Sequence, residues 1–388
     1  MLNFLHLFKQ LCKIQIIIFQ KPVTENLKYN IALTLLPNVG DILAKRLVAY
    51  CGSAQAIFKE KKSSLEKIPG IGSLIAKSVI NQTVFERAEE EIKYINDNNI
   101  SPLFYLDSNY PKRLLHCADS PIMLYYKGNA NLNAEKIISI VGTREATEYG
   151  KKICEKLIAD LAVYNVVIVS GLAYGIDIYA HKAALYNKLP TVCALAHGLD
   201  RIYPAIHQST ANKMLEGGGW LSDFISKTIP DRENFPRRNR IVAGISDATI
   251  VIESKKKGGS LITAEIANSY NRDVFAFPGR VDDLCSEGCN NIIKQNKAAL
   301  IQSASDLIYI LGWEQSKGLK APQQKKLFLE LSKEEELLMT VLKEKDLTTI
   351  DDICFASKLP MSKVSALLLT LEFSGIVKSF PGKTYRLN

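Results

Sequence analysis

The sequence lacks the short patterns that mark several large classes of protein. Its eight cysteines include no Cys-x-x-Cys pair, and Cys285 and Cys289 have no second pair of candidate ligands nearby. Scattered thiols of this kind are typical of a reducing cytoplasm, and they disfavour a disulfide framework and a metal site. No apolar run approaches the roughly 18–20 residues that a membrane-spanning helix needs. We therefore expect a cytoplasmic protein with free thiols, no bound metal and no membrane span.

Patterns for nucleotide binding and nucleophilic catalysis are missing as well. No G-x-G-x-x-G turn is followed by a ribose-binding acid, which disfavours NAD, and no GxxxxGK[ST] loop is present. Ser170 lacks the G-x-S-x-G elbow, and neither His197 nor His207 has an evident nucleophile to serve. Asp177 and His181, one helical turn apart, are more simply interpreted as helix-face contacts than as a metal or acid-base pair. We expect no cofactor and no catalytic residue.

What is present is a long, hydrophobic and basic chain. Its 388 residues suit two or three domains, 47% of them are hydrophobic, and the formal net charge is +9. A basic balance suits a polyanionic partner, although many basic proteins bind no nucleic acid. Residues 1–28 are apolar but interrupted by Lys9, Lys13 and Lys21, and no small-residue cleavage site follows. We leave this extension unassigned.

An internal repeat organises residues 29–84. LLPNVGDILAKRLVAY and KIPGIGSLIAKSVI align Gly40 with Gly72 and Ala44 with Ala76. The repeat resembles a tandem helix-hairpin-helix (SAM-like) domain, whose hairpin N–H groups can hold a DNA phosphate without reading sequence. Alternatively, it is a small helical packing domain in which the glycines only make tight turns. Residues 85–135 predict a helix followed by extended chain, which we interpret as a connecting segment.

Residues 136–313 alternate apolar runs with helical or loop segments. The runs are IISIVG, VVIVSG, TVCALAHG, ATIVIES and DVFAFPG. Short, near-continuous apolar runs indicate strands covered on both faces, which predicts an α/β, Rossmann-like, mainly parallel and doubly wound sheet. Ligands of such sheets bind beyond the carboxyl ends of the strands. The turns that follow the strands are Gly142–Arg144, Ser170–Gly175, His197–Asp200 and Lys257–Ser260. Arg144 can reach this groove as a phosphate donor, unless it pairs with Glu145 or Glu148.

The stretch from Phe235 to Glu265 concentrates the basic and aromatic residues. An aromatic ring and three arginines precede the strand ATIVIES, and a basic glycine turn leads from that strand into a helix. A helix N-terminus offers free N–H groups and partial positive charge to phosphate, and Phe235 offers a face to a nucleobase. Alternatively, Phe235 is ordinary core and the lysines form a solvated turn, in which only Lys257, beside the glycines, is a candidate ligand.

The C-terminal part predicts a linker and a small domain. Residues 314–330 are polar and contain glycine and proline, which is typical of a linker. Residues 331–388 read as three amphipathic helices and a hairpin that turns at Pro381-Gly382, which suggests a winged helix. Its third helix has only Lys363 as a basic residue, so strong reading of a DNA major groove is disfavoured. A module for protein contacts is the alternative.

The central motifs together resemble the DNA-processing protein A family, also called Smf. They are VGTR, SGLAYGIDIYAH, GLDRIYPAIH, FPRRNRIVAGIS, GGSLITAEIA, FPG and GCNNIIKQNKAAL, in this order. The resemblance implies a Rossmann-like domain without known catalytic chemistry, which holds single-stranded DNA and loads the recombinase RecA onto it during natural transformation. It also implies protection of incoming DNA, a homodimer, and contact with single-strand-binding protein.

The resemblance implies specific residues for these roles. DNA contacts would come from Arg144, Ser170, Gly171, Tyr174, Arg232, Phe235, Arg237, Arg238, Asn239, Arg240, Lys257, Gly259 and Ser260. The surface for the second copy and the recombinase would include Asn291, Ile292, Ile293, Gln295 and Leu300. Where some members have a basic residue in SGLA(K/R)GID, this chain has Tyr174, which exchanges a phosphate contact for stacking.

Two other classes of function compete with DNA binding. KGGSLITAE distantly resembles the PGGxGTxxE turn of Rossmann-like nucleotide phosphoribohydrolases, but Leu261 replaces its third glycine and Ile262 its threonine. A larger residue there would crowd the phosphate turn. A pure scaffold, the third interpretation, would rely on the helical end modules and leave the groove unused.

Overall fold

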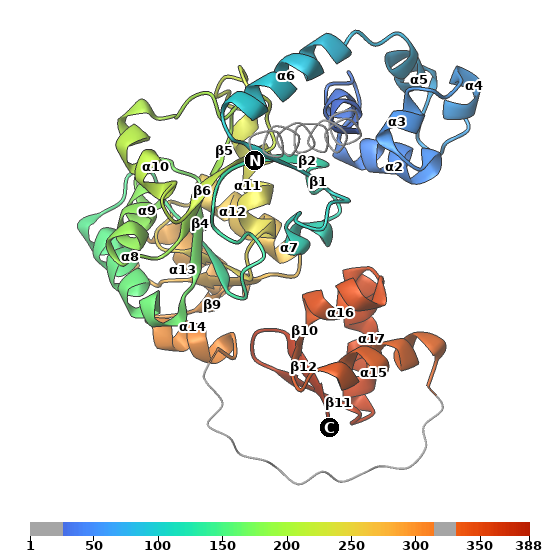
Figure 1. The fold of residues 1–388 in the computed structure, drawn as a ribbon. Coiled ribbons are helices and arrows are strands. Elements are labelled where there is room, and N and C mark those ends of the chain that lie inside the picture. Colours follow the sequence, from blue (N-terminus) through green and yellow to red (C-terminus); the bar gives the residue numbers. More distant parts are fainter. Residues whose placement is uncertain (1–25, 314–330) are drawn as a thin grey trace, which may run out of the picture.

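The computed structural model describes residues 26–313 and 331–388 (Figure 1). Residues 1–25 of the expected extension, and the whole of the predicted linker 314–330, lie outside the described residues. The described chain forms a helical N-terminal part, a central α/β part and a small C-terminal part. No single described helix is long and apolar enough to cross a membrane. One bent pair of helices, Ile350–Ser357 and Met361–Phe373, has the length and apolar composition of a membrane span, and that is the extent of the likeness.

The N-terminal part contains the expected repeat. It comprises a helix at residues 26–34 and the helices α2 (Asp41–Cys51), α3 (Ala54–Ile57), α4 (Lys62–Leu65), α5 (Ser73–Ile80) and α6 (Phe85–Asp97). Gly40 precedes α2 and Gly72 precedes α5 with matching backbone angles, φ −84° and ψ 174° in the first, φ −84° and ψ 177° in the second. The positive φ that each hairpin needs belongs instead to Asn38 (63°) and Gly70 (81°). The aligned glycines therefore do not make the tight turn; they begin the helices.

The central sheet has nine strands and confirms the predicted α/β class. They are β1 (Ser101–Phe104), β2 (Met123–Gly128), β3 (Ile137–Val141), β4 (Val167–Ser170), β5 (Thr191–Leu195), β6 (Gly219–Ser222), β7 (Ala248–Val251), β8 (Asp273–Ala276) and β9 (Ala299–Leu300). Their order is β1-β2-β6-β5-β4-β3-β7-β8-β9. All pairs from β6 to β9 are parallel, and β1 and β2 pair antiparallel at one edge. Each of the five predicted apolar runs contains one of these strands.

The interpretation of residues 85–135 as a connecting segment was wrong. Their two strands extend the sheet beyond β6, with Tyr125 opposite Ser222. Tyr125 is fully buried, and Glu91 on α6 accepts hydrogen bonds from Ser226 in the central part. The two strands of this segment are therefore part of the α/β core. The Glu91 carboxylate joins α6 to the central part through Ser226.

Helices cover both faces of the sheet, as a doubly wound fold requires (Figure 1). One face packs against α8 (Glu148–Leu161), α9 (Ile176–Tyr186) and α14 (Ala304–Ile310). The other packs against α7 (Lys112–Leu115), α11 (Asn234–Gly244), α12 (Gly259–Ser269) and α13 (Glu287–Lys294). Two 3₁₀ turns, η1 (Ala162–Tyr164) and η2 (Ala205–His207), and helix α10 (Gln208–Met214) complete the part. Neighbouring residues alternate faces: Ile137 joins the second core, and Ile138 the first.

The C-terminal part has the predicted winged-helix form. It contains α15 (Lys333–Glu344), α16 (Ile350–Ser357), α17 (Met361–Phe373) and a sheet of β10 (Thr348–Thr349), β12 (Thr384–Leu387) and β11 (Val377–Phe380), in that order. The hairpin turns at Pro381-Gly382, as expected. Lys363 on α17 pairs with Glu334 at 3.0 Å. This cation is therefore already partly neutralised.

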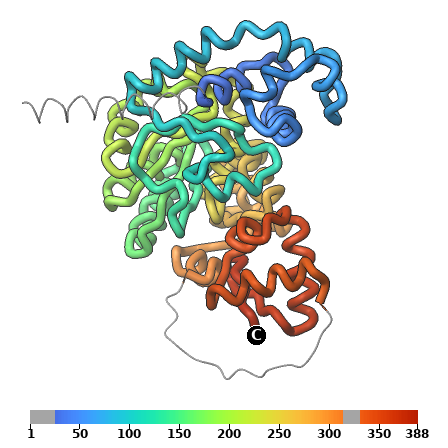
Figure 2. The backbone as a smooth tube through the Cα atoms, turned by 45° about the vertical axis from the view of Figure 1, so that its right-hand side comes forward, coloured from blue at the N-terminus to red at the C-terminus, as the bar shows by residue number. Residues whose placement is uncertain are grey.

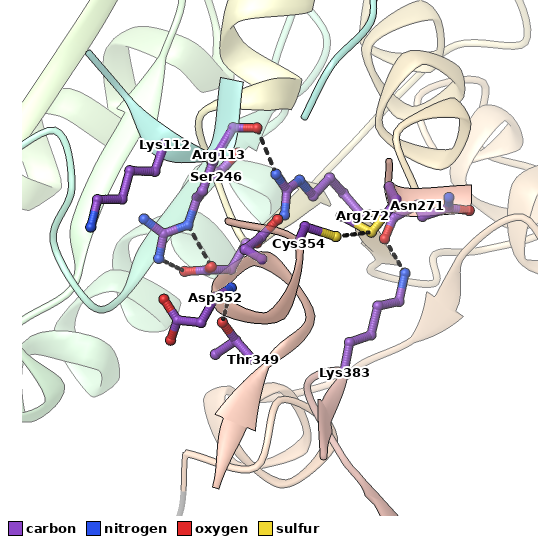
Figure 3. A network of polar contacts seen from close by, with 12 residues as sticks. Lys112, Arg113, Ser246, Asn271, Arg272, Thr349, Asp352, Cys354 and Lys383 are labelled. Carbon is purple, nitrogen blue, oxygen red and sulfur yellow. Dashed lines mark hydrogen bonds and ion pairs between the residues drawn. The ribbon is translucent and has the colours of Figure 1, made fainter. Parts of the chain in front are cut away.

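Charged side chains join the winged helix to the central part (Figure 3). Arg272, 5% exposed, forms an ion pair with Asp351 on α16 and donates to the Arg113 carbonyl at 2.9 Å. Lys112 lies 4.8 Å from the centre of the Phe355 ring. The wing turn is also close to α14, because a Cβ on Gly382 would lie 1.9 Å from the Leu311 carbonyl. Both backbone views place the winged helix beside this end of the central part (Figures 1 and 2).

Candidate nucleic-acid interface

The candidate site lies at the carboxyl ends of the central strands. Strand order runs outward in both directions from β3, whose neighbours are β4 and β7, so the topological switch point lies here. The turn after β3 is fixed by Glu253, which follows β7. The Thr143 N–H donates to the Glu253 carbonyl at 2.8 Å, and the Thr147 N–H donates to its carboxylate at 2.9 Å. Arg144 thus projects from a braced turn at the switch point.

Arg144 is exposed and lies against Phe235. Its Cζ is 5.4 Å from the centre of the phenyl ring, which is half-buried at the start of α11. Its acidic neighbour Glu145 pairs instead with Lys255, and Arg144 forms no ion pair with any residue in the described ranges. The alternative in which Arg144 pairs with Glu145 is therefore not the arrangement found. A guanidinium without an ion pair, beside a partly exposed aromatic ring, suits a phosphate and its base.

The turn before α12 brings a second set of donors to this rim. Gly259 and Ser260 are the first two helical residues, so their N–H groups have no acceptor within the helix. Lys255 and Lys256 pair with Glu145 and Glu287, whereas Lys257 is exposed and forms no ion pair with a described residue. The helix N-terminus and Lys257 therefore remain available to an anion.

Other side chains of this turn serve the fold. The Ser260 hydroxyl is buried and donates to the Ser254 hydroxyl at 2.9 Å, so only the backbone N–H of Ser260 remains a candidate donor. Leu261, which replaces a glycine of the phosphoribohydrolase turn, packs against the core beside α11. The enzyme motif has glycine at this position, whereas here the Leu261 side chain contributes to the packing of the core.

Arg238 was expected to contact DNA, and its burial contradicts this. It is 4% exposed, and its Nη1 donates to the carbonyl oxygens of Gly171 and Ala194, each at 2.6 Å. Burial lowers the pKa of this guanidinium, and the nearby charge of Asp177 opposes the effect. Arg238 therefore ties the ends of β4 and β5 together beneath the candidate site.

The turn at Ser170-Gly171 was expected to donate N–H groups to phosphate, and these donors are occupied or buried. The Gly171 N–H donates to the Asp177 carboxylate at 3.2 Å, and the Ser170 hydroxyl donates to the Ile140 carbonyl at 2.6 Å. Burial raises the pKa of Asp177, and the Arg238 charge lowers it in compensation. This turn forms the floor of the site and does not present free donors.

The remaining arginines divide between surface and core. Arg232 and Arg237 are exposed, and the Arg237 Cζ lies 5.1 Å from the Phe224 ring. Asn239 is half-buried and accepts from Arg238 Nε at 3.2 Å. Arg240 instead pairs with Asp41 at 2.9 Å and with Asp223 at 2.7 Å. The expected DNA contact of Arg240 is thus contradicted, because this arginine joins α11 to the N-terminal helices.

The expected surface for a second copy is only partly exposed. Ile292, on the inner face of α13, is 6% exposed and packs in the core, so its side chain is not available to an interface. Asn291 and Ile293 are half-buried, and Gln295 is exposed. Leu300 is 47% exposed on β9, the edge strand of the sheet. Leu300 and Gln295 are therefore the stronger candidates among these five residues.

The histidines and acids near the site are engaged in structural contacts. His181 Nδ1 lies 2.7 Å from the Thr191 hydroxyl, and His207 Nδ1 donates to the Leu172 carbonyl at 2.8 Å. Burial lowers the pKa of His181 to about 3, so this imidazole is neutral near pH 7. No group of three or more His, Cys, Asp or Glu residues within the described ranges could hold a metal ion.

Sequence reasoning missed Tyr203, which belongs to the GLDRIYP motif. Tyr203 is 48% exposed, and its ring lies 6.2 Å from the Phe235 ring, centre to centre. Tyr174, which was expected, is 49% exposed, and its ring lies 5.1 Å from that of His207. An aromatic residue in the loop beyond a strand, on the same rim as Arg144, was the signal that could have identified Tyr203.

Comparison with known proteins identifies the family. A model described as DNA recombination-mediator protein A matches residues 101–312, and one described as the DprA winged helix domain matches residues 322–383. Protein Smf of Synechocystis is 31% identical over 92% of this chain and 98% of its own length. DNA processing protein DprA of Streptococcus pneumoniae is 40% identical over 52% of this chain and 71% of its own length.

Two solved structures agree with these sequence relatives. The structure of DNA processing protein A from Streptococcus pneumoniae matches with a TM-score of 0.63 and 32% identity, over 72% of this chain and 96% of that one. DNA processing protein A from Helicobacter pylori, whose structure describes a single-stranded DNA binding mode, matches with a TM-score of 0.50 and 31% identity, over 54% and 94%. This chain therefore belongs to the DNA recombination-mediator protein A family, also known as DprA or Smf.

Proposed function

We propose that this protein binds single-stranded DNA, protects it, and loads the recombinase RecA onto it during natural transformation. The observation that carries the proposal is the contact between exposed Arg144 and half-buried Phe235 at the switch point of the sheet. The family supports it, since the Helicobacter pylori relative binds single-stranded DNA. The proposed activity is binding rather than catalysis.

The groove separates contacts to phosphate from contacts to bases. Arg144, Lys257 and the N-terminus of α12 would hold phosphates, with Arg232 and Arg237 near the α11 end of the path. Phe235 would stack on a base. In a duplex the base faces are already stacked on one another, so a ring of this kind favours single strands without reading sequence.

The recombinase and a second copy of this chain are the proposed partners. We assign them to the surface around Gln295 and Leu300, where β9 leaves one edge of the sheet unpaired by any described strand. Pairing of two copies would join two grooves on one DNA strand and raise the effective affinity. Contact with single-strand-binding protein would then assist exchange of that protein for RecA.

Oligonucleotide binding tests the DNA part of the proposal. Labelled oligo-dT and a duplex of equal length are titrated at two salt concentrations with the wild type, Arg144→Ala, Phe235→Ala and Phe235→Tyr. We expect a preference for oligo-dT, a weaker salt dependence for Arg144→Ala, and recovery of affinity in Phe235→Tyr. Equal binding by all four proteins would place the DNA elsewhere.

RecA loading requires its own assay. RecA filament formation is followed on oligo-dT coated with single-strand-binding protein, with the wild type and with Leu300→Asp. Leu300→Asp should bind as the wild type does to an oligo-dT too short for two copies, but stimulate filament formation less. Unchanged stimulation would remove β9 from the recombinase surface, and a loss of dimer in light scattering would identify the surface as self-association.

A further inference from the structure

We propose that Tyr174 and Tyr203 form a second base-stacking surface for single-stranded DNA, next to the Arg144–Phe235 contact. This inference rests on the proposed function, because it extends the path of the strand across the same groove. Both residues are about half exposed, 49% for Tyr174 and 48% for Tyr203. Tyrosines that serve only the core of this protein, such as Tyr110 and Tyr125, are almost completely buried.

Tyr203 continues the row of groups that begins at Arg144. The Arg144 Cζ lies 5.4 Å from the Phe235 ring centre, and the Phe235 ring centre lies 6.2 Å from that of Tyr203, with the two rings tilted by 57°. Tyr203 is therefore a direct neighbour of the ring that the function assigns to base stacking. A second accessible ring at this spacing can receive a neighbouring base.

Tyr174 lies beside the Arg144 turn. The next residue, Gly175, is pressed against that turn, because a Cβ there would lie 2.1 Å from the Thr143 carbonyl and 2.7 Å from that of Arg144. Gly175 also has φ of 75°, so the approach depends on glycine. The backbone at Tyr174 is thus held beside the cation at Arg144.

One short segment supports both tyrosine rings. His207, four residues after Tyr203, contacts the Tyr174 ring at 5.1 Å and an angle of 66°. The His207 imidazole is buried and donates to the Leu172 carbonyl at 2.8 Å, which fixes its orientation. Leu172 itself is buried with φ of 59°. Tyr174 therefore stands on a fixed support, and its exposed face is presented without a large loss of side-chain entropy on binding.

The chemistry of this surface is that of bases rather than phosphates. Tyrosine at position 174 provides no positive charge, so it adds stacking and leaves the salt dependence of binding unchanged. Stacking is tolerant of sequence, because every base has a π face. The ligand class is thus an unpaired, unstacked nucleobase next to the one on Phe235.

The test compares oligo-dT with an abasic oligonucleotide of the same length, which keeps the phosphates but has no bases. Tyr174→Ala and Tyr203→Ala are measured with Tyr174→Phe, Tyr203→Phe and the control Tyr186→Ala. Tyr186 is 88% exposed and ends α9, away from the strand ends. Arg144→Ala, measured in parallel, reports whether the groove binds DNA at all. Thermal unfolding of each variant reports on folding.

We expect each alanine variant to bind oligo-dT about 5- to 100-fold more weakly, with the phenylalanine variants near wild type. Affinity for the abasic strand and the salt dependence should not change. If both alanine variants bind oligo-dT normally while Arg144→Ala does not, the stacking surface is refuted and the proposed function stands. Equal losses on both oligonucleotides would also refute it, because the tyrosines would then only shape the groove. If the Arg144→Ala variant and both alanine variants of the tyrosines all bind oligo-dT normally, the stacking surface and the proposed function are both refuted.

Discussion

Arg238 Nη1 lies 2.6 Å from the carbonyl oxygen of Gly171, and a Cβ on Gly171 would lie 2.2 Å from the same nitrogen. A side chain at position 171 would therefore displace the guanidinium that binds the carbonyl of this residue. Because the same Nη1 donates to Ala194, the guanidinium joins the ends of two neighbouring strands beneath the proposed DNA site. An arginine in the basic FPRRNR stretch is thus a buried structural residue beneath the proposed site.

Replacing Arg238 should lower stability as well as DNA binding. Arg238→Ala leaves two buried carbonyl oxygens and the Asp177 carboxylate without their cation, at a cost of about 3–5 kcal/mol. The matched control is Arg237→Ala, whose side chain is exposed and which should change stability by no more than about 0.5 kcal/mol. Thermal unfolding of the two variants makes the comparison. Equal unfolding temperatures would show that Arg238 is not a structural residue.

The PRRNR run shows what the sequence can predict about the site. The run predicted a basic rim, and Arg237 is exposed there beside Phe235, the residue that precedes the run. Successive residues of a helix point in directions about 100° apart, so α11 sends Arg238 into the core and Arg240 toward Asp41. Which arginine is buried depends on carbonyls and carboxylates from distant segments. No pattern within the run contains that information.

For the strands too, the local sequence predicted some elements, whereas others depend on contacts with distant segments. β3, β4, β5, β7 and β8 were predicted because each lies in an apolar run covered on both faces. The sequences SPLF in β1 and GWLS in β6 are short and contain proline or glycine, so they do not stand out from loops. They are strands because neighbouring strands offer backbone partners. That context is tertiary, and the segment 85–135 was misinterpreted for this reason.

Asp351 should control the docking of the winged helix. Asp351→Asn leaves the buried Arg272 guanidinium without its charged partner, which should weaken docking by about 3–5 kcal/mol. Asp352→Asn is the matched control, since it removes the same charge from the first turn of α16 but loses only a 3.5 Å contact with Lys345. Small-angle X-ray scattering should show a larger radius of gyration for Asp351→Asn alone. The same radius for both variants would contradict this role.

The buried histidines predict a loss of stability in acid. Burial lowers the pKa of His116 and His197, and that of His181 to about 3. In the unfolded chain each imidazole takes up a proton near pH 6.5, which the folded protein resists. Stability is therefore fully present above pH 6.5 and falls as the pH drops toward the folded pKa values.

Substitution at His181 isolates one of these contributions. His181→Asn keeps a polar group near the Thr191 hydroxyl but cannot titrate. The slope of unfolding free energy against pH between 6 and 4 should decrease by up to about 1.4 kcal/mol per pH unit relative to wild type. Denaturant titrations at several pH values measure it. Identical slopes would mean that His181 is protonated in the folded state.

The repeated hairpins give a prediction that separates packing from DNA binding. An added Cβ at Gly40 or at Gly72 would meet no atom within 4 Å, and both residues have φ of −84°, which any residue can adopt. The fold therefore does not require glycine at either position. A requirement would have to come from a partner that approaches the backbone closely, such as a DNA phosphate held by the hairpin.

Gly72→Ala should fold as the wild type does and bind DNA less tightly. The hairpin of Gly40 faces the central part, since Asp41 accepts from the Ile122 N–H at 2.8 Å and pairs with Arg240. The second hairpin has an exposed helix start at Ser73. Gly40→Ala should therefore affect DNA binding less than Gly72→Ala.

Gly70→Ala completes this series as a variant whose defect lies in the fold. Its φ is 81° and an added Cβ would lie 2.2 Å from Arg46 Nη1, so it should lower the unfolding temperature. Binding of single-stranded and duplex oligonucleotides is measured for the three variants beside thermal unfolding. If Gly72→Ala loses affinity while keeping its unfolding temperature, the hairpin holds phosphate, because only an external ligand would meet the new methyl group. If its affinity is unchanged, the repeat serves to pack the N-terminal helices, and DNA binding rests on the central groove alone.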